Sequence, residues 1–454
     1  MAANGERKPL LEISDVTGEL QLHEHRLSIT GSIAISNEGT ITLNINPVPL
    51  NDETKWLMTT VPNKGRLATW VSLRASAPDA PTIESDYITL LGRGTQISRD
   101  APATISLQAQ ASQLTIHHGP APATASNCST RYLTVGMRGF AAQHATTTVG
   151  EIRLAGQSEI KNHDELAGFL QITAYQHEAS SIDDWLAACD TATDHILQII
   201  SLAEAKRIHW SIRQTFHDNQ LLRSDLYGPR HTGDPYDGMF HFLNLQPVLD
   251  LAVNHYTQQL RDTTGIELAI NLLLANPGHA ELLLISSMTA LEHLVSSYEK
   301  QHPTPQPLDE DLFNDKVKPV LEATYDRIVN ALPRPAHKEQ KEKFEHGIRR
   351  VRDRIANLNH TTFTDKLFSM LHAYQVPLVG IEDRIKAFID ARQRIIHTGE
   401  HDAAFKDFYL HIAVLRELLK RIILTLLKYD GDYISFLNGQ EFLHFPPTNV
   451  TLQP

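Results

Sequence analysis

One short stretch of the chain carries residues that could perform metal-free chemistry on a phosphodiester. Arg392 precedes His397 by five residues in ARQRIIHTGE, positions 391–400. Histidine titrates near neutral pH and can take or give a proton, and arginine binds phosphate oxygens through a two-pronged fork. RNA cleavage without a metal needs a base for the ribose 2′-hydroxyl, an acid for the leaving 5′-oxygen and positive charge on the phosphorane. This pair has the side chains for such a site.

The segment 381–398 is predicted to form the amphipathic helix that positions the pair. Its apolar face consists of Ile381, Ile385, Phe388 and Ile395. Arg392 falls on the same face, where a charge needs a partner such as Glu292. A purely structural alternative is therefore open, in which Arg392 pairs with a buried carboxylate and His397 caps the end of the helix.

One continuous helix presents the pair poorly on a single face. Five residues turn a helix by about 500°, so His397 lies about 140° round from Arg392. A terminal helix turn, or a second copy across a two-fold axis, could bring the two groups together. Spacing alone is not specific, because similar intervals separate Arg138 from His144 and Arg354 from His360.

Composition limits the other classes of function. The chain has 454 residues, of which 24 are histidines. Its net charge of −12 disfavours indiscriminate binding to nucleic acid. No histidine belongs to a recognised metal-binding motif, and no nucleotide-binding glycine motif occurs, so we expect neither a metal nor another cofactor. The two cysteines, Cys128 and Cys189, lie far apart. Without a signal sequence or an apolar span, we expect a soluble, cytoplasmic protein that does not contact a membrane.

The hydrophobic pattern predicts an α+β protein with several domains. Residues 1–178 read as a β-rich domain, a sandwich or a barrel-like sheet, with alternation such as Ile41, Leu43 and Ile45. Residues 179–238 read as a helix, capped by Ser181, followed by a β-hairpin with a long turn. Residues 239–437 read as a helical bundle, and 438–454 as a C-terminal tail that is extended from Phe445 onward. Within the bundle, segment 402–428 has the longest apolar seam.

A second candidate site is the basic run 335–354 within a predicted helix. Lys341, Arg349 and Arg350 are the residues that we expect to contact RNA phosphates. The alternative is a solvated helix face held by the pairs Glu339–Lys343 and Glu345–Arg349.

The stretch around Arg392 resembles the HEPN superfamily (higher eukaryotes and prokaryotes nucleotide-binding domain). The matching residues are Arg392, Ile395, His397 and Gly399, with the upstream helix MTALEHL at 288–294. The layout, a β-rich region followed by the bundle, resembles the ApeA-type anti-phage HEPN proteins. One position departs from the family, because Gln393 stands where Asn, Asp or His is usual; glutamine keeps a donor and an acceptor but carries them farther out.

The resemblance implies a metal-independent RNA endonuclease that acts in abortive infection. Arg392 and His397 would be catalytic and Gln393 supporting, with host RNA such as tRNA as the substrate. It also implies a homodimer through the helical domain, and a β-rich domain that senses a trigger, such as a phage protein, or regulates the nuclease. The alternative is a non-catalytic HEPN-like module for dimerisation or for nucleotide or RNA binding, with the β-rich domain as its partner-binding element.

Overall fold

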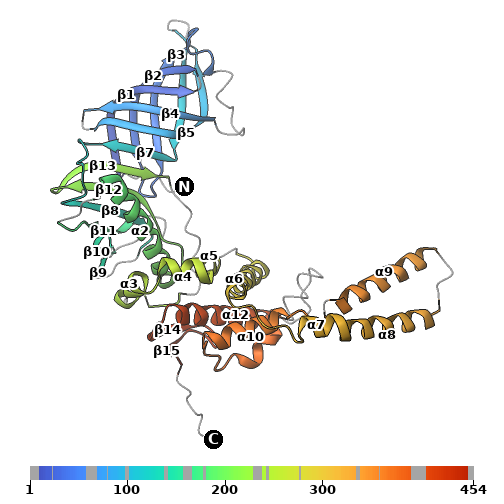
Figure 1. Ribbon diagram of the computed structural model, residues 1–454. Helices are drawn as coiled ribbons and strands as arrows, with labels where there is room; N and C mark the ends of the chain where they lie inside the picture. Colours follow the sequence, from blue (N-terminus) through green and yellow to red (C-terminus); the bar gives the residue numbers. More distant parts are fainter. Residues whose placement is uncertain are drawn as a thin grey trace. The chain divides into compact units, whose positions relative to one another are not determined.

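The computed structural model describes residues 10–22, 24–57, 69–78, 80–97, 102–137, 142–156, 166–176, 180–228, 238–241, 245–275, 278–333, 338–356, 358–389 and 405–447. The chain divides into two compact units. A β-rich unit comprises Met1–Thr257, Ile270–Leu283 and Leu427–Thr448, and a helical unit comprises Gln258–Ala269, Leu284–Leu426 and Asn449–Pro454. The prediction of a β-rich N-terminal region followed by a helical region is therefore confirmed (Figure 1).

Six strands at the start of the chain close into a barrel. They are β1 (Leu11–Leu22), β2 (His25–Ile35), β3 (Ile41–Pro49), β4 (Thr69–Ala77), β5 (Ala80–Gln96) and β6 (Thr104–Ala111). Their order is β4-β1-β2-β3-β6-β5, and β4 also pairs with β5, which closes the ring. Side chains with period two fill the interior, as Ile41, Leu43 and Ile45 show in β3.

The same sheet continues beyond the barrel. Its further strands are β7 (Gln113–His117), β8 (Cys128–Val135), β9 (Gln143–Thr147), β10 (Gly150–Ala155), β11 (Leu166–Thr173), β12 (His209–His217) and β13 (Gln220–Tyr227). They lie in the order β5-β7-β13-β12-β8-β11-β10-β9. The short strand β7 joins the two parts, because it pairs with both β5 and β13.

The hairpin β12–β13 is confirmed, but its predicted long turn is wrong. Only Asp218 and Asn219 separate the strands, with φ angles of 50° and 63°. This is the backbone conformation of a two-residue turn, which Asn and Asp tolerate.

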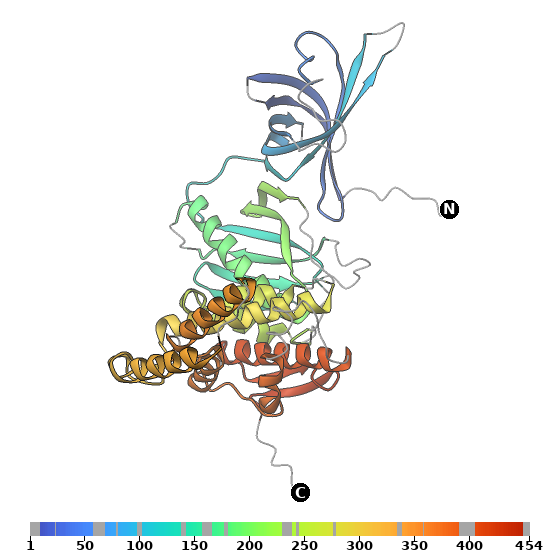
Figure 2. The ribbon, with the colours of Figure 1, turned by 90° about the vertical axis from the view of Figure 1, so that its right-hand side faces the viewer.

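Helix α2 (Ile182–Glu204) covers one face of this second part of the sheet (Figure 2). The predicted cap is present, since the Ser181 side chain accepts a hydrogen bond from the Asp184 N–H at 3.2 Å. The apolar residues that recur at helical spacing along α2 are also buried: Leu186, Cys189, Ile196, Ile199, Ile200 and Ala203. On the opposite face of the sheet, Ile212 and Leu226 join the apolar core of the barrel.

Helices dominate the rest of the chain. They are α3 (Leu245–Asn254), α4 (Gln258–Thr264), α5 (Ile266–Leu274), α6 (Ala280–Gln301), α7 (Glu310–Leu312), the π-helix η1 (Phe313–Val317), α8 (Lys318–Ala331), α9 (Lys338–Ala356), α10 (Phe363–Ala373) and α12 (Phe405–Leu426). Helices α8 and α9 form a hairpin (Figure 1). None of the helices in the described ranges is long and apolar enough to cross a membrane.

The expectation that 239–437 is helical throughout is wrong at its end. A hairpin of β14 (Gly431–Ser435) and β15 (Glu441–Phe445) follows α12. Tyr433, in the range predicted to be helical, and Phe445, in the predicted tail, are buried against each other, with ring centroids 5.9 Å apart. The hairpin therefore belongs to a core and not to an extended end.

Candidate functional site

The predicted nuclease residues Arg392, Gln393 and His397 lie outside the described residues. The structure does describe the start of the predicted helix, which is helical over 382–389. Ile381, Ile385 and Phe388 are fully buried there. The apolar face that the sequence predicts is thus buried over the first two turns of the helix. In the sequence pattern, Arg392 is the next position on that face.

A buried ion pair holds the chain immediately before this helix. In α12, Arg421 donates from Nε to Glu417 at 2.9 Å, and both side chains are almost completely buried. Arg421 Nη1 also donates to the carbonyl oxygens of Pro377 and Val379, at 3.1 and 2.7 Å. Because Val379 lies two residues before Ile381, this arginine fixes where the helix begins.

The other residues of the predicted site occupy two different helices. Glu292, the proposed partner of Arg392, lies on α6 and is half-buried. Lys341, Arg349 and Arg350 lie on α9, where the last two side chains are exposed. The predicted pair Glu345–Arg349 does not form in the described part of α9; instead Arg352 forms an ion pair with Asp326 of α8. Two arginines of the basic run are therefore accessible to a ligand.

A polar cluster that the sequence did not predict lies between α2 and the sheet. Asp225 of β13 is fully buried and accepts two hydrogen bonds from Arg213, at 3.1 and 2.7 Å. It also accepts from Arg223 at 2.9 Å and from the Thr115 hydroxyl at 2.8 Å. Arg213 reaches Asp190 of α2 as well. The cluster therefore ties three strands to the covering helix.

Electrostatics keep this cluster ionised. Burial alone raises the pKa of Asp225, but Arg213 and Arg223 outweigh it and hold that pKa below its ordinary value. Burial, and then the charge of Asp190, raise the pKa of Tyr132. The Tyr132 phenol therefore stays protonated and donates to Asp190 at 2.8 Å. Paired charges with satisfied hydrogen bonds are the arrangement that a buried charge needs.

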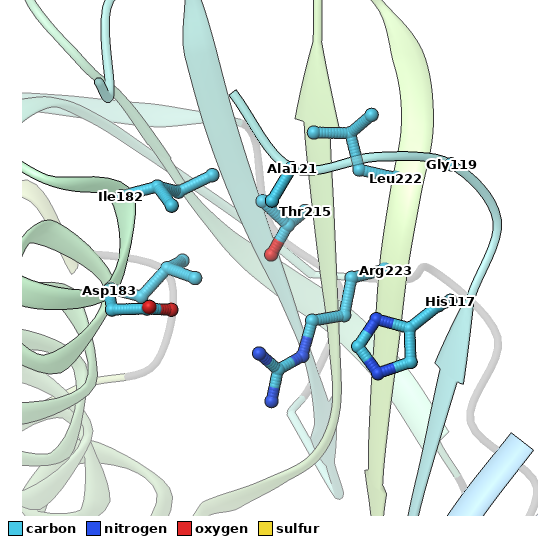
Figure 3. Close-up of a pocket in the computed structure, with 9 residues that line it drawn as sticks. His117, Gly119, Ala121, Ile182, Asp183, Thr215, Leu222 and Arg223 are labelled. Carbon is cyan, nitrogen blue, oxygen red and sulfur yellow. The ribbon is translucent and has the colours of Figure 1, made fainter. Parts of the chain in front are cut away.

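Beside the cluster, a cavity of about 50 Å³ opens between α2 and strands β7, β12 and β13. Figure 3 shows Arg223 extending toward α2, with His117 beside it and Thr215 above. The Thr215 side chain is 1% exposed, and its hydroxyl has no hydrogen-bond partner among the described residues. Arg223 and Thr215 face each other across the β12–β13 pair.

Sequence reasoning missed this site because no local motif marks it. Its residues come from strands separated along the chain by as many as 110 positions. The available signal was weak: Arg213, Thr215, Arg223 and Asp225 alternate along a hairpin, which places them on one face. Among the described residues, no group of three or more His, Cys, Asp or Glu side chains could hold a metal ion.

Comparisons with models of protein families, with curated proteins and with solved structures found no match to this chain.

Proposed function

We propose that the chain is a metal-independent RNA endonuclease of the HEPN type, with Arg392 and His397 as its catalytic residues. His397 transfers a proton at the 2′-hydroxyl or at the leaving 5′-oxygen, and Arg392 stabilises the phosphorane. The observation that carries the proposal is the sequence ARQRIIHTGE at the end of a predicted helix. The burial of Ile381, Ile385 and Phe388 supports it, because it gives the motif a rigid base.

The substrate class follows from the exposed cations on the helical unit. Arg349 and Arg350 of α9 are exposed on a chain whose net charge is −12. A local basic face on an acidic protein favours a phosphate backbone at that face. We therefore propose RNA, such as tRNA, as the substrate, and a role in anti-phage defence with the β-rich unit sensing the trigger.

The test compares four proteins on total tRNA with EDTA present: wild type, Arg392→Ala, His397→Ala and Arg384→Ala. Arg384 is exposed on the described turns of the same helix and serves as the matched control. We expect wild type and Arg384→Ala to produce fragments with 2′,3′-cyclic phosphate and 5′-hydroxyl ends, because the 2′-oxygen is the nucleophile. The two motif variants should leave the RNA intact.

The assay is run alone and with an extract from phage-infected cells, which supplies a protein trigger. Fragments of equal amount from wild type and His397→Ala in both conditions would refute the catalytic assignment.

One observation favours a second function, a module for association. The described residues of α8 include no buried side chain, and Val320 and Ile328 are 64% and 55% exposed on one face of that helix. Such a stripe fits a partner helix. If the helical unit only associates, sedimentation will show dimers while the tRNA stays intact in both conditions.

A further inference from the structure

The cavity beside the buried cluster has the size of a small functional group. Its volume is about 50 Å³, and a water molecule needs about 10–15 Å³ on this measure. It therefore admits a group of about three or four non-hydrogen atoms. Its walls come from the first turns of α2, from β12 and β13, and from the end of β7 (Figure 3).

The Thr215 hydroxyl indicates that this space receives a polar ligand. Buried hydroxyl groups nearly always have a hydrogen-bond partner, yet Thr215 has none in the described part of the chain. Thr130, its neighbour on β8, is also buried without a partner but does not line the cavity. Only the Thr215 hydroxyl could be satisfied by a molecule in this cavity.

Arg223 supplies further donors. Its Nε donates a hydrogen bond to Asp225 Oδ1 at 2.9 Å, and its Nη2 lies 2.8 Å from the same oxygen in the ion pair. Its Nη1 has no hydrogen bond to any described residue, and the side chain is 32% exposed. The N-terminus of α2 adds the positive end of a helix dipole, because Ile182 and Asp183 in its first turn line the same space. Donors that converge in this way favour a ligand with acceptor oxygens.

Charge and wall chemistry narrow the class of ligand. Arg213 and Arg223 are balanced by Asp190 and Asp225, and Asp183 adds one negative charge at the cavity. This net negative charge repels a doubly charged phosphate about twice as strongly as a singly charged group, and a group with two acceptor oxygens matches the donors. The remaining walls are apolar: Ile182, Leu186 and Leu222.

We propose that this cavity binds a small aliphatic monocarboxylic acid. One carboxylate oxygen accepts from the Thr215 hydroxyl and the other from Arg223 Nη1, while the aliphatic part lies against Leu222 and Ile182. The site is in the β-rich unit, so this proposal does not rest on the proposed ribonuclease function.

The experiment uses the full-length protein and three probes: acetate, acetamide and inorganic phosphate. Acetate and acetamide each have four non-hydrogen atoms, which matches the size of the cavity. Binding of the two organic probes is followed by saturation-transfer NMR of the ligand, and that of phosphate by ³¹P line width. We expect saturable binding of acetate, much weaker binding of the neutral acetamide, and no binding of phosphate. Equal binding of acetate and acetamide would overturn the proposal, as would binding of phosphate as tight as that of acetate.

Three variants test the site itself. Thr215→Val should weaken acetate binding about tenfold, because it removes one hydrogen bond to a charged group. Thr130→Val, the same change on the neighbouring strand, should leave the affinity unchanged. Asp183→Asn should strengthen binding several-fold by removing a like charge, a gain that a misfolded variant cannot imitate. Unchanged affinity in both Thr215→Val and Asp183→Asn would refute this location.

Discussion

Replacing Asp225 by asparagine should destabilise the β-rich unit strongly. Asp225 is fully buried and accepts hydrogen bonds from Arg213, Arg223 and Thr115. Asparagine keeps one acceptor oxygen and presents an NH₂ group, which opposes the donors of a guanidinium. The change also removes the carboxylate that pairs with Arg223, while Arg213 keeps Asp190.

The magnitude follows from burial and distance. One buried pair at about 4 Å is worth about 4 kcal/mol at an effective dielectric constant of about 20. Removing one partner of a buried pair costs about 3–5 kcal/mol. Arg213 retains Asp190, whose side chain is 30% exposed, so we expect the lower end, a loss of about 3 kcal/mol.

The natural fluorophores make the assay specific. All four tryptophans, Trp56, Trp70, Trp185 and Trp210, belong to the β-rich unit, so their fluorescence in urea follows the unfolding of that unit. With an m-value of about 3 kcal/mol/M, the midpoint should fall by about 1 M.

The matched control is Asp218→Asn in the exposed turn of the same hairpin. The Asp218 side chain is 64% exposed and lies 3.7 Å from His217, so its loss should change the free energy of unfolding by less than about 0.5 kcal/mol. A loss below about 1 kcal/mol for Asp225→Asn would refute the reasoning, because the cluster would then be relaxed or hydrated.

Three further predictions concern other contacts. The pKa of Asp225 is lower in the folded than in the unfolded chain. The ionised carboxylate therefore stabilises the fold above pH about 4, and this stabilisation is lost as the pH falls further. The urea midpoints of wild type and Asp225→Asn should converge only below that pH. Arg421→Met removes the bonds to Glu417 and to two carbonyl groups and should cost about 3 kcal/mol, seen by far-UV circular dichroism while the tryptophan transition stays in place. The Gln246 side chain forms hydrogen bonds with both the N–H and the C=O of His144 on the edge strand β9. Gln246→Ala would leave these edge-strand groups open to pairing with another chain, so it should cause concentration-dependent association, measured by light scattering. An unchanged mass would contradict this.

Some elements were predictable because one local pattern determines them. Ile41, Leu43 and Ile45 alternate without interruption, so β3 was found. Alternation alone does not predict β1, because a bulge between Ile13 and Val16 interrupts it. The pattern does not predict β9 either, because Gln143–Thr147 contains no large apolar residue and lies at the edge of the sheet.

The cavity could not be predicted because it depends on which strands are neighbours. Thr115 and Asp225 meet only because β7 pairs with β13, across 110 residues of chain. The period of a strand gives the face on which a residue lies but not the strand beside it. Burial within one helix, in contrast, does not depend on distant neighbours. Helical spacing alone predicted that Ile381, Ile385 and Phe388 are buried.

The pairing of β7 has a mechanical consequence. Its contact with β5 extends over Thr82–Glu84, whereas its contact with β13 extends over Arg223–Tyr227. A force that pulled the barrel away from the second part of the sheet would act on both ladders, and the one with fewer residue pairs would break first. The sheet should therefore part between β5 and β7, and Thr115 and His117 would stay with β13, so that the cavity would outlast the loss of the barrel.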